Sequence, residues 1–399
     1  MFGTTMGSTY GSVFGSLRPD ASPDKQSPAP AQKMSRSINY IADYGGCGHW
    51  RVIWPSSLLN AHQRHIVHSN SAMITAPEFY KDVTSVRLQR QVTSYQQQFV
   101  GFLESVNKDM HIMYDIDDVF IYEDIPGYNK FRAAYRDPAI RETGLSIMKR
   151  CSEVTVTCNY MKEYYEQFVD HVTVIPNYMP KFWMDRYYDE GRLAKNYDRS
   201  VKKRKKPRVL YAASGAHFDV TGQNKYVDDF SHISDMVRKT INDIQWVFLG
   251  AFPMPLRDLV TSGKIEFVHW KMIPDYPDHI HSLKVNLAIA PLMDNTFNKC
   301  KSDLKFIEAG AFGIPCICQD LVTYSNAYYK FTTGDELLDQ INVLLKDKPT
   351  YLKACRKSRE YATTRWLEDH IDLYDELYKF PRGDDQRKQL NLLQETNNI

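Results

Sequence analysis

One stretch in the last third of the chain combines the residue types that bind a nucleoside diphosphate. It runs from Lys301 to Asp320 and reads KSDLKFIEAGAFGIPCICQD. The spacing of its apolar residues predicts a polar loop, then a helix, then a short buried strand. Lys301 and Lys305 place positive charge at the start of that helix, where free backbone N–H groups attract phosphate. Glu308, one turn later, can accept hydrogen bonds from the hydroxyls of a ribose, so we expect a nucleoside diphosphate site here.

A glycine loop near the start of the chain is a second phosphate candidate. The residues Ile38–Ile41 predict a strand, and the loop that follows contains Gly45, Gly46 and Gly48 before a predicted helix. A strand, a glycine loop and a helix in this order let the backbone approach a phosphate closely, as in the first turn of a Rossmann-like domain. A plain tight turn has the same composition, so both interpretations stay open.

An acidic run follows another predicted buried strand. The segment His111–Asp118 reads HIMYDIDD and carries Asp115, Asp117 and Asp118. Such carboxylates can bind Mg²⁺, form a phosphatase-type aspartyl nucleophile, or only cap the next loop. Our preferred interpretation places them at a cleft, where Asp117 or Asp118 orients an acceptor hydroxyl or takes its proton. Arg90 ends a strand that faces the same cleft, so it either pairs with these carboxylates or, like Asp115, binds the acceptor.

Two successive sets of alternating strands and helices must position these residues. Such alternation predicts two doubly wound α/β domains with a cleft between them. Trp366–Lys379 has the pattern of a final amphipathic helix. Besides the strands named above, the predicted strands are Met73–Thr75, Ser85–Leu88, Cys151–Thr157, Val172–Pro176, Arg208–Ala212, Gln245–Leu249, Ile265–Val268, Val285–Ala290 and Pro315–Cys318.

Composition narrows the class of protein. The 399 residues are 43% hydrophobic and 25% charged, and the net charge of +2 is no global signature of nucleic-acid binding. The basic run Lys202–Lys206 is a solvated hinge or a local contact to phosphate. Seven cysteines without paired spacing predict reduced thiols. No apolar run reaches the roughly 18 residues of a membrane span. We therefore expect a cytoplasmic protein.

Taken in order, the motifs resemble those of GT-B glycosyltransferases, specifically the family 4-like group 1 type found in bacteria and phages. The resemblance covers the chain from about Tyr44 to Thr364. It is carried by the glycine loop before His49–Pro55, Leu88–Gln91, Tyr114–Asp118, Val174–Asn177, Ala213–His217, and the block from Ala290–Leu292 through Asn298, Lys301, Ser302, Lys305 and Glu308 to Gly313–Pro315.

The resemblance implies two facing Rossmann-like, doubly wound domains and a C-terminal helix that crosses back to the first domain. It divides the chain into a disordered N-terminal tail, 1–33; an N-terminal acceptor domain, 34–182; a linker, 183–206; a C-terminal nucleotide-sugar domain, 207–365; the crossover helix, 366–385; and a polar tail, 386–399.

The resemblance also implies roles for individual residues, without a metal. Glu308 takes the ribose hydroxyls, and His217 faces the donor phosphates and joins Asp117 and Asp118 as a candidate catalytic residue. The diphosphate is held by Lys301, Ser302 and Lys305, with help from the amides of Gly45 and Gly46. The two-glutamate signature E-x7-E is incomplete, because Cys300 stands at its first position. Residues that could substitute for that glutamate are Asp294, Asn295 and Asn298.

The leading hypothesis is a retaining transferase that moves a hexose or pentose from a nucleoside-diphosphate sugar to a hydroxyl. The acceptor is either a hydroxymethylated base of phage DNA, modified in the host cytoplasm, or a cell-surface or other glycan. The basic run Lys202–Lys206 and a crowd of aromatic residues favour DNA, and a base within a duplex would have to be flipped out to react. A non-catalytic protein that binds nucleotide sugars is the alternative of a different class.

Overall fold

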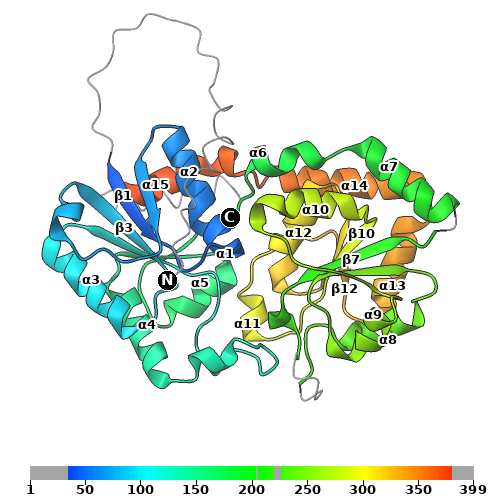
Figure 1. Cartoon of the computed structure of the whole chain (residues 1–399), viewed down its shortest axis with the longest axis horizontal. Helices are drawn as coiled ribbons and strands as arrows, with labels where there is room; N and C mark the ends of the chain where they lie inside the picture. The colour runs from blue at the N-terminus through cyan, green and yellow to red at the C-terminus, as the bar shows by residue number, and fades with distance from the viewer. Residues whose placement is uncertain (1–34, 204, 220–225, 380–399) are drawn as a thin grey trace, which may run out of the picture.

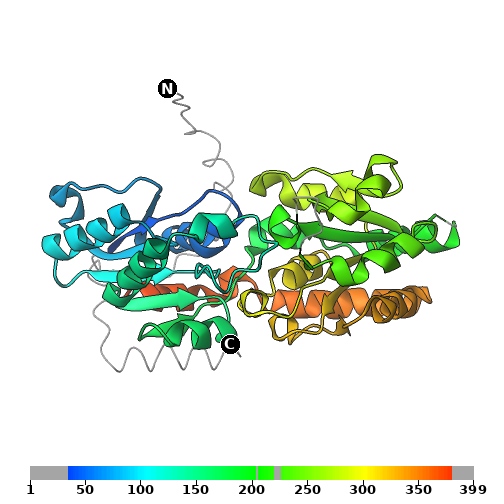
Figure 2. The same cartoon turned by 90° about the horizontal axis from the view of Figure 1, so that it is seen from below.

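Two parallel six-stranded sheets form the framework of the protein, and they lie side by side in two lobes (Figures 1 and 2). The computed structural model describes residues 35–203, 205–219 and 226–379, so the predicted tails 1–33 and 386–399 lie outside the described residues. The first sheet has the order β2-β1-β3-β4-β5-β6 and the second β12-β11-β10-β7-β8-β9.

The strands of the N-terminal sheet are β1 (Arg36–Tyr40), β2 (Ile66–Asn70), β3 (Val83–Gln89), β4 (His111–Asp115), β5 (Glu153–Val156) and β6 (Val172–Val174). Those of the C-terminal sheet are β7 (Arg208–Ala213), β8 (Gln245–Gly250), β9 (Glu266–Val268), β10 (Leu287–Ala290), β11 (Cys316–Gln319) and β12 (Tyr329–Phe331).

The helices of the N-terminal domain are α1 (Gly46–Gly48), α2 (Trp54–Ala61), α3 (Ser94–Val106), α4 (Pro138–Arg150) and α5 (Asn159–Glu166), with a π-helical turn (His49–Ile53) between α1 and α2. The others are α6 (Lys181–Met184), α7 (Glu190–Tyr197), α8 (Ser234–Lys239), α9 (Arg257–Thr261), α10 (Tyr276–Leu283), α11 (Thr296–Lys299), α12 (Leu304–Ala311), α13 (Gly334–Leu345), α14 (Lys348–Thr363) and α15 (Ile371–Tyr378).

Both sheets are doubly wound, which determines where a ligand can bind. The strand order reverses between β1 and β3 in the first sheet and between β7 and β10 in the second. In open parallel sheets of this kind a crevice forms at the carboxyl ends of the strands at the point of reversal. The glycine loop follows β1 and Arg90 follows β3, while Ser214 follows β7. The topology therefore brings the predicted site residues to these two edges.

Local sequence explains the helices that flank the sheets. Thr93 caps α3 in a capping box with Gln96. Thr333 and Glu336 form the same arrangement at the start of α13. The strand β4 is buried along its whole length, including His111 and Asp115 at its two ends.

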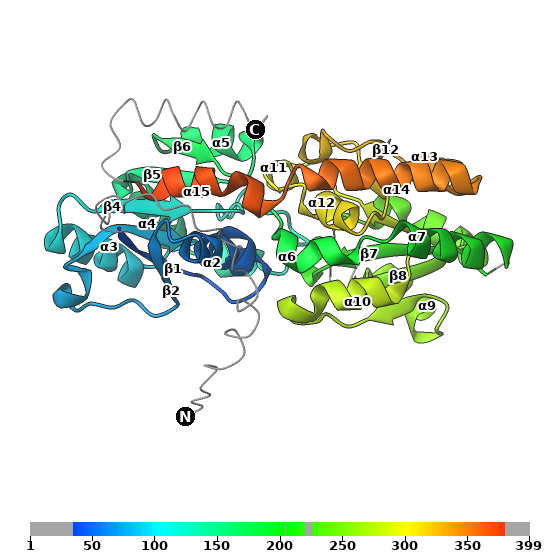
Figure 3. The ribbon, with the colours of Figure 1, turned by 90° about the horizontal axis from the view of Figure 1, so that it is seen from above.

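The C-terminal helix crosses back to the N-terminal domain, which confirms that part of the predicted fold. After α14, a 3₁₀ turn (Leu367–His370) leads into α15, which packs against α2 (Figure 3). The Tyr378 hydroxyl donates to the buried Asn39 side chain of β1 at 2.8 Å. The backbone N–H of Leu367 donates to the carbonyl of Met179 at 2.8 Å. These contacts attach the end of the described chain to the N-terminal lobe.

The structure differs from the predicted secondary structure in one absent strand and two additional edge strands. Met73–Thr75 is not a strand, because the backbone of Ile74 bonds to tyrosine side chains instead of a neighbouring strand; its carbonyl accepts from the Tyr80 hydroxyl at 2.6 Å. The edge strands β2 and β12 were not predicted. The segment 183–206, predicted as a linker, includes α7, which packs against α14. Within the described residues no helix is long and apolar enough to cross a membrane.

Candidate functional site

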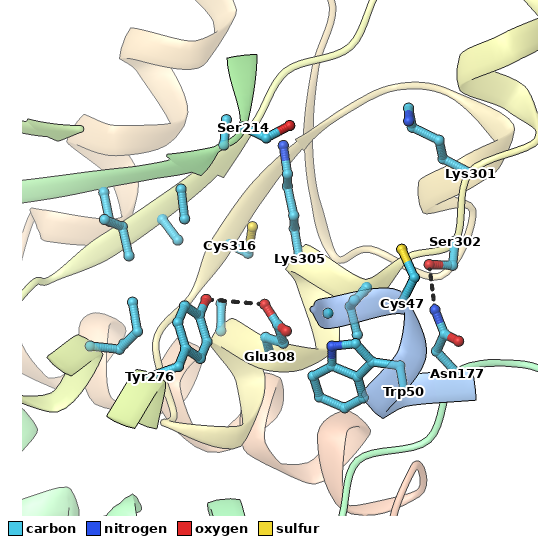
Figure 4. A pocket seen from close by; sticks show the side chains of 18 of the residues that line it. Cys47, Trp50, Asn177, Ser214, Tyr276, Lys301, Ser302, Lys305, Glu308 and Cys316 are labelled. Atoms are coloured by element: carbon cyan, nitrogen blue, oxygen red, sulfur yellow. Dashed lines mark hydrogen bonds between the residues drawn. The ribbon is translucent and has the colours of Figure 1, made fainter. Parts of the chain in front are cut away.

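A cavity of about 330 Å³ lies where the carboxyl ends of the two sheets face each other. The loops after β1, β3 and β4 line it from the N-terminal domain, and β7, β10 and α12 line it from the C-terminal domain. Figure 4 shows side chains of both domains around it, among them Trp50, Lys305 and Glu308. The cavity brings together most of the residues that the sequence singled out. These are Gly46, Arg90, Asp117, Asp118, His217, Lys301, Ser302, Lys305 and Glu308.

The N-terminus of α12 lies at the cavity, where Lys301, Ser302 and Lys305 also line it. The preceding residue, Asp303, makes no side-chain hydrogen bond to the helix and instead pairs with Arg365 at 3.0 Å. The Lys301 Nζ lies 4.2 Å from the centre of the Phe297 ring. Because the positive end of the helix and two lysines coincide, an anion at this place is stabilised.

Lys305 is held by a histidine and a carboxylate behind it. Its Nζ lies 3.5 Å from the Nε2 of His217, whose Nδ1 lies 2.7 Å from the Oδ2 of Asp229. Burial and, to a smaller extent, the charge of Lys305 lower the pKa of His217 to about 4. Burial also lowers the pKa of Lys305 to about 8. Near neutral pH the imidazole is therefore neutral and Lys305 carries the charge, so His217 positions the cation rather than being one.

Glu308 lies one turn further along α12 on the same side as Lys305. Its Oε2 accepts a hydrogen bond from the Tyr276 hydroxyl at 3.1 Å (Figure 4). Burial raises the pKa of Glu308 to about 7, although Tyr276 and Lys305 oppose the shift. A second oxygen is available to a ligand hydroxyl, which is the chemistry that a ribose requires.

Aromatic side chains surround the Glu308 end of the cavity. Trp270 and Tyr276 lie with ring centres 5.5 Å apart, and Trp183 stacks on Tyr276 at 6.3 Å. Trp50, from the π-helical turn, lines the same cavity (Figure 4). Such flat apolar faces suit the stacking of a nucleoside base.

The glycine loop is only partly available to a ligand. Gly46 lines the cavity, but Gly45 does not, and its N–H donates to the Oδ1 of Asp43 at 2.6 Å. The predicted role of the Gly45 amide at the diphosphate therefore does not fit its hydrogen bond. Gly48 is required for packing, since a Cβ there would lie 1.9 Å from the Asp43 carbonyl oxygen.

Arg90 pairs with the acidic run, as one of the two interpretations predicted. Its guanidinium is bonded to Asp117, and its Nη2 lies 3.9 Å from the Oδ2 of Asp118. Arg90 adopts a φ of 51°, a left-handed conformation that costs a non-glycine residue energy. Asp118 is the more exposed of the two carboxylates and is left with the looser contact.

Asp115 lies outside the cavity, and its predicted role in acceptor binding does not fit its position. Its side chain is 0% exposed and pairs with Arg51 at 2.8 Å and with Arg87. The Thr155 hydroxyl donates to the same oxygen at 2.6 Å. Arg51 also donates to Asn177, which lines the cavity, so this buried cluster supports the cavity from within the N-terminal domain. Asp115 supports the architecture and is inaccessible to an acceptor.

The residues that could substitute for the missing first glutamate make other contacts, away from the cavity. Asp294 pairs with Lys299 at 2.6 Å. Asn295 caps α11 by accepting from the N–H of Asn298 at 2.8 Å. Asn298 is buried, and Cys300 is buried beneath the loop. None of these residues lines the cavity.

Several residues at the site were not predicted from sequence. Asp229, Tyr276, Trp50 and Trp270 carry no recognisable motif of their own, and Asn177 belongs to the Val174–Asn177 motif but was assigned no role. The Nδ2 of Asn177 donates to the Ser302 hydroxyl at 2.9 Å and so joins the two domains (Figure 4). Among the described residues, no group of three or more His, Cys, Asp or Glu is arranged to bind a metal.

Solved structures show the same fold. The structure is similar to that of Anabaena Alr3699/HepE in complex with UDP and glucose, with a TM-score of 0.57 and 12% identity over 87% of this chain and 100% of that chain. For the complex of the same protein with UDP-glucose the TM-score is 0.55, at 10% identity over 85% and 98% of the two chains. No protein-family model and no curated sequence matches the chain. The likeness confirms the predicted GT-B arrangement of two Rossmann-like domains.

Proposed function

We propose that this protein is a glycosyltransferase that moves a sugar from a nucleoside-diphosphate sugar to a hydroxyl acceptor. One observation carries the proposal: Lys305 and Glu308 lie one turn apart on α12, whose N-terminus faces a cavity between the two domains. The cation at the helix N-terminus suits a diphosphate, and the partly buried carboxylate one turn later suits the hydroxyls of the ribose next to it. The HepE complexes contain UDP and UDP-glucose, so we propose a uridine donor first.

The chemistry we propose needs positive charge at the leaving group. The bond from the anomeric carbon to the diphosphate breaks, and a bond from the same carbon to the acceptor oxygen forms on the same face of the sugar. Negative charge develops on the leaving oxygen, where the Lys301 and Lys305 ammonium groups and the α12 N–H groups stabilise it. We propose that these groups take the role that a metal fulfils in other transferases.

Asp118 is the carboxylate that we propose to take the acceptor proton, because Arg90 binds Asp117 more closely. Removing this base should lower transfer and donor hydrolysis about 100-fold. Asp118→Asn should leave the dissociation constant for UDP within about twofold of wild type, because the diphosphate binds on the other domain. Steady-state release of UDP, with calorimetry on the same samples, tests this. An equal loss of UDP affinity would contradict the assignment.

Among acceptors, we propose a hydroxyl of a glycan. The basic run Lys202–Lys206 precedes β7, whose opposite, carboxyl end at Ala213 lines the cavity. The Lys206 Nζ donates to the Ile241 carbonyl at 2.8 Å. The described part of this run therefore lies at the end of β7 away from the cavity, which weakens one argument for DNA.

A hydroxymethylated base of phage DNA is the second candidate acceptor. It is favoured by the loop that follows the acidic run, where the Lys130 Nζ lies 4.9 Å from the half-exposed ring of Phe131. Aromatic and basic residues together suit a splayed-out nucleic acid. Binding to DNA that weakens steeply as salt increases would favour this acceptor. Indifference to DNA would favour the glycan.

The first experiment is a thermal-shift panel of uridine, guanosine, adenosine and thymidine diphosphate sugars. A bound nucleotide raises the melting temperature by mass action. We expect the UDP-sugars to give the largest increase and UDP to be released slowly on incubation with a UDP-sugar. A shift without any release, even with acceptors, would identify a non-catalytic nucleotide-sugar-binding protein. No shift with any nucleotide would contradict the proposal.

Glu308→Gln separates the ribose contact from the diphosphate contact. We expect the affinity for UDP to decrease about tenfold, because a charged acceptor for the ribose hydroxyls is lost. The affinity for inorganic pyrophosphate should stay within twofold. Since the pKa of Glu308 is about 7, wild-type affinity for UDP should increase as the pH rises through 7, and the variant should lack this increase. Calorimetry with both ligands over pH 6 to 8 measures the two effects. Equal losses for UDP and pyrophosphate would contradict the ribose assignment.

A further inference from the structure

Tyr128 belongs to the N-terminal domain but bonds to the C-terminal domain. It lies in the connection between β4 and α4, and its hydroxyl donates to the Oδ1 of Asp229 at 2.6 Å. The Nδ2 of Asn298 donates to the same hydroxyl at 3.0 Å. All three side chains are buried, so this contact crosses between the lobes away from solvent.

Asp229 accepts hydrogen bonds from both domains. Besides the Tyr128 hydroxyl, it accepts hydrogen bonds from the Met293 N–H at 2.9 Å, the Asn298 Nδ2 at 2.6 Å and the His217 Nδ1 at 2.7 Å. Burial alone would raise the pKa of Asp229, but the bonds from His217, Met293 and Tyr128 lower it below its usual value. An ionised carboxylate accepts only, so Nδ1 of His217 carries the proton.

The protonation state of His217 determines how its ring contacts Lys305. With the proton on Nδ1, the Nε2 of His217 has a free lone pair, and this atom lies 3.5 Å from the Nζ of Lys305. An imidazole oriented by a carboxylate in this way fixes the group on its other nitrogen. The chain of contacts therefore runs from Tyr128 through Asp229 and His217 to Lys305.

We propose that Tyr128 is a positioning residue that acts from the opposite domain, through Asp229 and His217, to hold the Lys305 ammonium where the diphosphate of the donor binds. The proposal rests on the proposed function of the cavity. Because Tyr128 and Lys305 come from different domains, the cation is fully positioned only when the two domains are in contact.

A double-mutant cycle with UDP as the probe tests the proposal. Tyr128→Phe, which removes only the hydroxyl, should weaken UDP binding about threefold to tenfold. In a Lys305→Met background the same substitution should change the affinity by less than twofold, because the group it acts on is absent. Tyr164→Phe is the matched control, since Tyr164 donates to Asp124 at 2.6 Å within the N-terminal domain. Equal losses from Tyr128→Phe in both backgrounds, or no loss in either, would overturn the proposal.

A second measurement needs no nucleotide. Acetylation of Lys305 at fixed pH, followed by peptide mass spectrometry, reports the fraction of neutral amine. Tyr128→Phe and Asp229→Asn should each increase the rate severalfold, because the ammonium loses a fixed acceptor, whereas Tyr164→Phe should not change it. An unchanged rate in both test variants would overturn the chain of contacts. If the wild-type protein binds no UDP but the rates change as expected, the proposed function fails and the positioning role stands.

Discussion

Lys305→Met should reduce release of UDP from a UDP-sugar about 100- to 1000-fold, the cost of removing one preorganised donor from a developing negative charge. The substitution keeps an aliphatic side chain of similar length and removes the ammonium, whose Nζ lies 4.9 Å from the centre of the Tyr211 ring. The affinity for UDP should also decrease, because the same cation contacts the bound diphosphate. Steady-state rates, with the dissociation constant for UDP from calorimetry, measure both losses.

The pH dependence of UDP binding gives an independent check on this lysine. The pKa of Lys305 is about 8, so its ammonium form predominates below pH 8 and is lost above it. Wild-type affinity for UDP should therefore decrease as the pH rises from 8 to 10, and Lys305→Met should be flat over that range. The bound diphosphate favours the ammonium, so the midpoint lies at or above 8. Lys299→Met is the control, because Lys299 pairs with Asp294 outside this cavity. If the UDP affinity of Lys305→Met decreases between pH 8 and 10 as it does in the wild type, the assignment of Lys305 to the diphosphate site is wrong.

Asp115→Asn should destabilise the protein by about 3–5 kcal/mol, because it leaves two buried arginines without their counter-charge. Burial would raise the pKa of Asp115, but Arg51 and Arg87 lower it to about 2, against 3.8 for an unperturbed aspartate. The stabilisation is thus complete above pH 4 and is lost as the pH decreases from 4 toward 2. Urea unfolding at pH 7 and at pH 3 measures both effects.

Glu104→Gln is the matched control for Asp115→Asn in the same domain. Glu104 pairs with Arg150 at 2.5 Å on the surface, where both side chains are partly exposed. Surface pairs of this kind contribute about 0–1 kcal/mol. If Asp115→Asn folds with wild-type stability but loses activity, Asp115 acts in the reaction and our structural assignment is wrong.

Much of the fold could be predicted because local patterns determine it. A buried parallel strand such as β10 is a continuous apolar run, and the capping residues of α3 and α13 lie beside their helices. The edge strand β2 escaped prediction because it is only partly buried and because three of its five residues, His68, Ser69 and Asn70, are polar. The strand β12 is three residues long, too short for a periodic signal.

The site could be predicted only in part, for a different reason. Lys301, Lys305 and Glu308 are close in sequence, so helical spacing alone places them together. Asp229 reaches Tyr128 across 101 positions of sequence, and no local pattern encodes such a contact. Asp115 ends β4 and Asp117 follows two residues later. Asp115 is nevertheless buried against two arginines, whereas Asp117 lines the cavity. Only the packed structure distinguishes them.

The most direct test of the account is a crystal structure of the protein with UDP. We predict that the diphosphate lies within hydrogen-bond distance of the Lys305 Nζ and the first N–H groups of α12, with the ribose hydroxyls at Glu308. UDP bound at any other place, or a diphosphate in this cavity that contacts neither Lys305 nor the start of α12, would contradict it.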